Sequence, residues 1–94
     1  MSTAPGLSPR QSRSSTASDF STLSAAADSA RAADRLDEAV RLYGKALALQ
    51  PRWKEGWWAL GTVLYDQDSH AAAARAFRRL LVLDPANGTA HLML

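Results

Sequence analysis

From about residue 20 onward, apolar residues recur with the 3.6-residue period of an amphipathic helix. Four of them stand at i, i+3, i+4 and i+7, which places them on one helix face. They are Leu23, Ala26, Ala27 and Ala30. We expect this first helix to run from about 20 to 33, with Ser18 or Asp19 as its N-terminal cap.

A second apolar stripe follows a short turn around Asp34 and Arg35. Asp37 and Glu38 lie in the first turn of this helix, where carboxylates oppose the positive end of the helix dipole. Pro51 cannot continue a helix and disfavours helical backbone at the residue before it, so we expect the helix to end there. The residues of the stripe are Leu36, Ala39, Val40, Tyr43, Ala46 and Leu47.

The pattern predicts a third helix from about 53 to 67, and a fourth from a turn at 66–69 to about 83. Pro85 ends the fourth helix as Pro51 ends the second. Gly61 has no side chain, so it lets the two helices of a hairpin approach closely. We expect eight residues of this pair to face inward: Trp57, Leu60, Gly61, Leu64, Ala73, Phe77, Leu80 and Leu81.

The two helix pairs repeat each other with a fixed period. Pro51 and Pro85 are 85 − 51 = 34 positions apart, and the segment 46–51 matches the segment 80–85. A repeat of this length is typical of stacked helical hairpins, in which each unit buries its apolar face against the next. Further pairs in this register are Asp34 and Asp68, Ala39 and Ala73, Tyr43 and Phe77, Leu47 and Leu81, and Leu49 and Leu83.

The second repeat resembles the tetratricopeptide repeat. The residues that match the Trp, Leu-Gly, Ala, Phe and Pro positions of that family are Trp57, Leu60, Gly61, Ala73, Phe77 and Pro85. Leu64 stands where the family usually has Tyr, and the first repeat is looser, with Leu23 for the Trp and Ala26-Ala27 for the Leu-Gly pair. The resemblance implies an all-α fold, an α-α superhelix or solenoid of helix-turn-helix units. Its concave groove would be lined by the first helix of each pair.

This reading divides the chain at residue 20. Residues 1–19 are rich in Ser and Thr and contain Pro5 and Pro9, so we expect a disordered tail. Residues 20–94 form the predicted tetratricopeptide domain, with repeat one at 20–53, repeat two at 54–87 and a partial third repeat at 88–94. Because the third unit has no second helix, we expect the chain to be the N-terminal piece of a longer array. The alternative is that another chain covers the uncapped C-terminal end.

The third helix has a second face, which we expect to line the groove. Trp58 and Tyr65 on this face combine a large apolar area with a polar tip, as interface anchors do. Arg31, one repeat earlier, is placed to pair with a carboxylate of a bound peptide. The alternative for Trp58 is packing against the neighbouring repeat. The predicted partner-binding residues are Asp28, Arg31, Glu55, Trp58, Thr62 and Tyr65.

The charge and the composition narrow the class of partner. The chain has 11 basic and 9 acidic residues, and 20–94 keeps 11 − 2 = 9 basic against 9 − 1 = 8 acidic ones, so it lacks the basic stripe that nucleic acid requires. Arg75, Arg78 and Arg79 cluster, which we interpret as a solvated helix face. No apolar run approaches the roughly 20 residues of a membrane span. The absence of cysteine leaves the compartment open, and we favour the cytoplasm.

Candidate chemical sites each have a simpler structural explanation. Asp66 and Asp68 fall at an inter-helix turn, where Asp is expected for local hydrogen bonding rather than for a metal. His70 and His91 have no ligand cluster beside them both, and no phosphate loop or nucleophile motif is present. Some tetratricopeptide domains clamp a chaperone's C-terminal carboxylate with Lys and Asn, but the groove positions here carry residues such as Ser24 and Asp28. We therefore expect no catalytic residue, no metal and no cofactor.

The sequence as a whole predicts a non-catalytic protein–protein interaction module that binds a peptide or helix of a partner in its groove. Two other hypotheses stay open. One is that the repeats are the N-terminal segment of a larger enzyme, in which they select substrates. The other is a structural element that self-associates through its C-terminal end.

Overall fold

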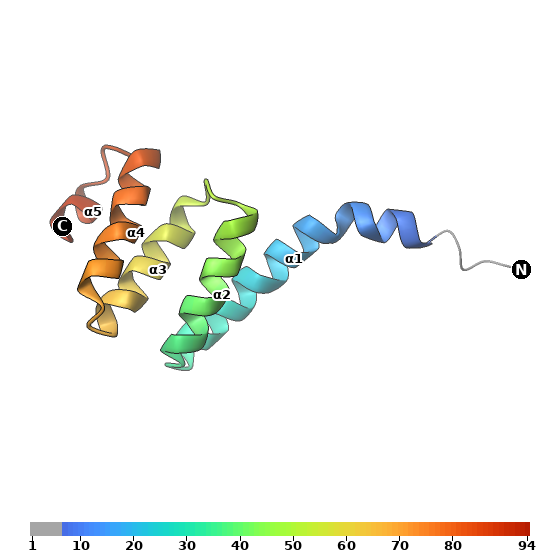
Figure 1. Ribbon diagram of the computed structural model, residues 1–94, viewed down its shortest axis with the longest axis horizontal. Coiled ribbons are helices and arrows are strands. Elements are labelled where there is room, and N and C mark those ends of the chain that lie inside the picture. The colour runs from blue at the N-terminus through green and yellow to red at the C-terminus, as the bar shows by residue number, and fades with distance from the viewer. Residues whose placement is uncertain (1–6) are drawn as a thin grey trace, which may run out of the picture.

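The computed structural model describes residues 7–94, and from residue 18 onward it describes their side chains as well. This part of the chain is all-helical and contains no strand. The helices follow one another across the molecule, and each packs against its neighbour in sequence (Figure 1). They are α1 (Leu7–Ala32), α2 (Leu36–Leu49), α3 (Lys54–Asp66), α4 (His70–Leu83) and α5 (Gly88–Leu92).

The N-terminal start of α1 differs from the sequence prediction. The helix begins at Leu7 instead of near residue 20, so neither Ser18 nor Asp19 is a cap. Pro9 lies in the first turn of α1, where a helix makes no use of the missing N–H group, so it does not prevent the helix from starting there. Residues 1–6 of the predicted tail lie outside the described part, and the domain boundary at 20 stays a prediction.

The other helix bounds agree with the sequence and recur with the predicted period. The starts of α2 and α4, at 36 and 70, are 70 − 36 = 34 residues apart, and so are the starts of α3 and α5, at 54 and 88. The ends of α1 and α3, at 32 and 66, keep the same spacing. Pro51 and Pro85 each follow the helix that they were predicted to end.

The turns inside the two hairpins have the same geometry. Asp34 and Asp68 both have φ 62°, a left-handed conformation that Asp tolerates better than most residues. Arg35 N–H donates to the Ala30 carbonyl at 2.8 Å, and one period later Ser69 N–H donates to the Leu64 carbonyl at 2.9 Å. Asp34 and Asp68 therefore occupy the left-handed position of the two turns, whereas the local hydrogen bonding expected of Asp66 and Asp68 stays a prediction.

Two hydrophobic clusters form the core. The first joins α1, α2 and α3, and its largest buried side chain is Tyr43. The second joins α3, α4 and α5 around Phe77, with Trp57 and Trp58 partly buried against it. A Cβ atom on Gly61 would lie 2.7 Å from the Phe77 ring, so the absence of a side chain there permits this approach of α3 to α4.

The short helix α5 repeats the start of α3. The Trp57 indole N–H donates to the Pro51 carbonyl at 2.8 Å, and the His91 Nε2 atom lies 2.9 Å from the Pro85 carbonyl, one period later. The side chain of Asn87 caps α5 by accepting from Ala90 N–H at 2.8 Å. The start of α5 therefore repeats these contacts of α3 at a spacing of 34 residues, and a third repeat at 88–94 stays a prediction.

Candidate functional site

Asp28 and Arg31, predicted for the groove, lie beside a buried tyrosine of α2. The Tyr43 hydroxyl donates to the Asp28 carboxylate at 2.5 Å. Tyr43 is fully buried, whereas Asp28 and Arg31 are exposed. The pKa of Tyr43 is raised to about 12, first by burial and second by the hydrogen bond to Asp28, while Arg31 acts in the opposite direction. One role of Asp28 is therefore to satisfy a hydroxyl in the hairpin.

Trp58 and Thr62 of α3 are both half-buried. The Trp58 ring packs on Phe77 of α4, with ring centroids 5.4 Å apart, and it belongs to the cluster that α5 completes. The Thr62 hydroxyl donates within its own helix, at 2.9 Å from the Ala59 carbonyl. Trp58 thus packs inside its own repeat rather than on the neighbouring one, which was its alternative, and part of its surface stays accessible.

Tyr65 and Glu55 are the most open of the predicted residues on α3. Tyr65 is 46% exposed and its ring lies 4.7 Å from the ring of His70. Glu55 is exposed and borders a small hollow with Trp58 and Asn87 between α3 and the start of α5. These side chains are accessible to a partner on one side of the second hairpin.

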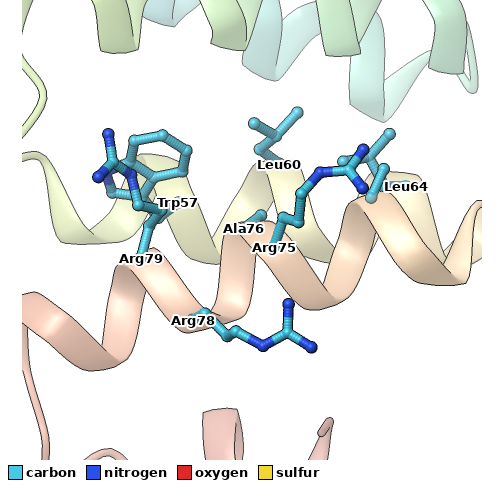
Figure 2. Close-up of a pocket in the computed structure, with 8 residues that line it drawn as sticks. Trp57, Leu60, Leu64, Arg75, Ala76, Arg78 and Arg79 are labelled. Carbon is cyan, nitrogen blue, oxygen red and sulfur yellow. The ribbon is translucent and has the colours of Figure 1, made fainter.

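A hollow of the molecule lies on a different face of α3. It has a volume of about 530 Å³, within the range of roughly 300–1,000 Å³ that ligand pockets occupy. Trp57, Leu60 and Leu64 were expected to be buried inside the hairpin. They do pack against the core clusters, but only as partly buried side chains, and their accessible parts line this hollow. Figure 2 shows these side chains and their neighbours on α4. We call this hollow the Trp57 pocket.

The wall of the Trp57 pocket on α4 alternates small and basic side chains. The residues that α4 contributes are Ala72, Arg75, Ala76, Arg78 and Arg79. Arg75 and Arg79 extend on the same side as Trp57, Leu60 and Leu64, whereas the guanidinium of Arg78 extends the other way (Figure 2). The Arg79 guanidinium carbon lies 5.5 Å from the centroid of the Trp57 ring, in a cation–π contact that holds it at the mouth.

Two smaller hollows continue the Trp57 pocket toward α2 and toward the end of α4. Both share Trp57 and Arg79 with it, and one adds Gly44, Leu47 and Ala48 from α2. Together the three linings contain four arginines, with Arg52 as the fourth, and no carboxylate. The combined surface is an apolar trough with a basic rim.

Sequence reasoning missed this pocket because it assigned Trp57 and its neighbours to the hairpin interior. The available signal was the run of four alanines at 71–74 followed by Arg75. Small side chains on α4 cannot cover the large ones on α3, so the latter stay accessible. The cluster of Arg75, Arg78 and Arg79 was evident in the sequence, but the accessible apolar surface beside it on α3 was not.

Within the described residues, no helix has the length and apolarity to cross a bilayer. The same part of the chain shows no group of three or more His, Asp or Glu residues placed to hold a metal ion. Comparison of the chain with protein-family models gives no match, and comparison with curated proteins gives no similar sequence. The function is therefore argued from the geometry above.

Proposed function

We propose that the chain is a non-catalytic protein-interaction module, built as a tetratricopeptide-type solenoid, that binds a peptide or helix of a partner in its groove. The recurrence of helix bounds, turn conformations and ring-to-carbonyl contacts every 34 residues supports the stacked-hairpin part of this proposal. Stacked hairpins of this kind leave one side of their first helices open along the array.

The observation that carries the binding part is the exposure of Tyr65 beside the partly accessible Trp58. Both lie on the side of α3 that does not contribute to the Trp57 pocket. Large aromatic side chains with polar tips that stay exposed in the free protein are frequent anchors of protein interfaces. Asp28 and Arg31 supply charges of both signs at the corresponding positions of α1.

The test selects peptides from a random displayed library against the full chain and compares their affinity for variants. Tyr65→Ala is the informative change, because Tyr65 is exposed and its removal leaves the core intact. We expect a loss of affinity of about tenfold, as truncation of an anchor costs at least about 1–2 kcal/mol. Trp58→Ala is less selective because it also removes packing on Phe77.

Circular dichroism of Tyr65→Ala should match that of the wild-type chain, since the change lies outside the core. Peptides that bind Tyr65→Ala as tightly as the unmodified chain would refute the groove assignment. Turnover of a substrate by the chain alone would contradict the non-catalytic part of the proposal.

A further inference from the structure

We propose that the Trp57 pocket is a second binding site and that it takes an acidic amphipathic helix of a partner protein. This inference rests on the proposed function in treating the chain as an interaction module, but it assigns a different face and a specific ligand chemistry. Three features carry it: the apolar floor, the arrangement of its arginines, and the contrast with the first hairpin.

The floor fits the apolar stripe of a helix. Trp57, Leu60 and Leu64 are spaced i, i+3 and i+7 along α3, so they form a line of accessible apolar surface. A partner helix with its own apolar residues at i, i+3 and i+7 can lie along this line. The hollows beside Gly44 and Pro51 extend the apolar surface past the pocket itself.

The rim requires negative charge on the ligand. Arg75 and Arg79 are one helical turn apart on the same side of α4, beside the apolar floor (Figure 2). In the part of the chain that the structure describes, neither guanidinium lies within 4.0 Å of a carboxylate, and no acidic residue borders the pocket. Carboxylates on the ligand at the edges of its apolar stripe would form charge-assisted hydrogen bonds with both arginines.

The equivalent surface of the first hairpin also has a hollow, of about 440 Å³, but an acidic residue, Asp19, lines it. Subtracting 34 from Ala72, Arg75 and Ala76 gives Glu38, Arg41 and Leu42. Arg41 lies 3.7 Å from Glu38, and Leu42 is a buried side chain where the second hairpin has only an alanine. Lys45 and Leu23, the counterparts of Arg79 and Trp57, line the hollow of the first hairpin together with Asp19. The two surfaces therefore differ in their acidic residues, which border the first hollow and are absent from the lining of the Trp57 pocket.

The apolar floor distinguishes a protein ligand from nucleic acid. A phosphate backbone is bound by a basic surface and gains little from burying leucine side chains. The arginines here border a trough whose interior is formed by Trp57, Leu60, Leu64 and two alanines. A ligand that uses the whole site presents apolar side chains between carboxylates, as an acidic amphipathic helix does.

The experiment measures binding of a fluorescently labelled synthetic helix to the full chain by anisotropy. The probe carries Leu and Phe at i, i+3 and i+7 with Glu on both flanks. A charge-reversed probe replaces each Glu by Lys, and a scrambled probe keeps the composition but breaks the apolar stripe. We expect only the first probe to bind, more weakly at high salt because the rim charges are screened.

Arg75→Glu with Arg79→Glu should weaken this binding by about tenfold or more, since two attractions become repulsions. Arg41→Glu on the first hairpin makes the same charge change as Arg75→Glu alone, but outside the lining of the pocket, and should have no effect. Arg78→Glu tests whether the direction of the side chain matters. Because the Arg78 guanidinium extends away from the floor, this change should weaken probe binding less than Arg75→Glu or Arg79→Glu does. Tyr65→Ala should leave this probe's affinity unchanged, which separates the pocket from the groove.

Equal binding of the scrambled probe, or equal losses for Arg41→Glu and Arg75→Glu, would show general charge attraction and overturn the proposal. So would displacement of the probe by a single-stranded oligonucleotide at equal charge concentration. If the pocket variants bind the probe normally while Tyr65→Ala still weakens the groove peptides, only the proposal of the Trp57 pocket is refuted. If the pocket variants lose the probe while Tyr65→Ala leaves the groove peptides unaffected, the groove proposal is refuted and the pocket proposal stands.

Discussion

The two hairpins share one backbone design but differ in how their side chains complete it. In the first, α1 presents Ala27 to α2, and Tyr43 is tied by its hydroxyl to Asp28. In the second, α3 presents Gly61, and Phe77 fills the same position without a polar partner. A helical repeat can thus hold its geometry constant while its hydrogen bonds, small residues and surface charges vary.

The difference extends to the surface. Both hairpins have a hollow on this flank, but the first has Asp19 in its lining and pairs Arg41 with Glu38. The lining of the Trp57 pocket has no acidic residue, and within the described residues Arg75 and Arg79 have no carboxylate within 4.0 Å. The first has the side-chain hydrogen bond that links its helices, and the second has the surfaces suited to binding.

The largest expected effect concerns the close contact between Gly61 and the Phe77 ring in the second hairpin. Gly61→Leu should lower the free energy of unfolding by about 1–3 kcal/mol, because its side chain would overlap the buried Phe77 ring. Gly44→Leu makes the same change where nothing lies within 4 Å, and it should stabilise by about 0.5–1 kcal/mol through helix propensity. Urea denaturation of both variants checks the pair, and an equal response would show that the hairpin is not closely packed at Gly61.

A smaller effect, on probe affinity, should follow when the second hairpin receives an acidic residue where the first has Glu38. Ala72→Glu places a carboxylate three residues before Arg75, as Glu38 stands before Arg41. The new acid competes for Arg75 and repels an acidic ligand, so affinity for the acidic amphipathic probe should fall about fivefold, a surface-charge effect of roughly 1 kcal/mol. Ala72→Gln adds similar bulk without charge and should have less effect. A loss as large for Gln as for Glu would mean that bulk, not charge, decides binding.

The smallest effect concerns the hydroxyl that only the first hairpin has. Tyr43→Phe makes the first hairpin resemble the second and should cost about 0.5–1 kcal/mol, the net value of one hydrogen bond. It should also change the dependence of stability on pH. Because the pKa of Tyr43 is raised to about 12, the folded state keeps the phenol proton that the unfolded chain loses near pH 10. The contribution of Tyr43 to the free energy of unfolding is therefore complete below pH 10 and is lost as the pH rises toward about 12.

Denaturation at several alkaline pH values measures this loss, and Tyr43→Phe should lack the part of the slope that Tyr43 contributes. An unchanged slope in the variant would mean that the Tyr43 hydroxyl is not protected in the folded state.

Much of the fold could be predicted because the determining signals are local. Pro51 and Pro85 end helices by their own covalent geometry, and the 34-residue register fixes the remaining bounds. The early start of α1 could not be predicted, since Ser- and Arg-rich sequence is compatible with both helix and coil, and Pro9 is tolerated in a first turn.

The candidate sites were predicted less completely because they depend on pairs of distant residues. How accessible Trp57 is depends on which side chains of other elements pack on it, such as Arg79 of α4, and not only on its own position on α3. The Tyr43–Asp28 hydrogen bond likewise joins residues 15 apart, and no spacing rule for a single helix contains it. Tyr65, in contrast, was predicted on an outward face and is exposed.

Three tryptophans provide the most direct test of the claim that recognition belongs to the second hairpin. The Trp53 ring packs on Phe20 and Tyr43 of the first hairpin, Trp57 lines the pocket, and Trp58 lies on the groove side. NMR of the three indole N–H signals, during titration of the full chain with the acidic amphipathic probe, reports on all three regions at once. If the probe binds in the Trp57 pocket, the Trp57 signal shifts first and furthest while that of Trp53 stays in place. A shift centred on Trp53, or a Trp57 signal unmoved at saturating probe, would contradict the claim.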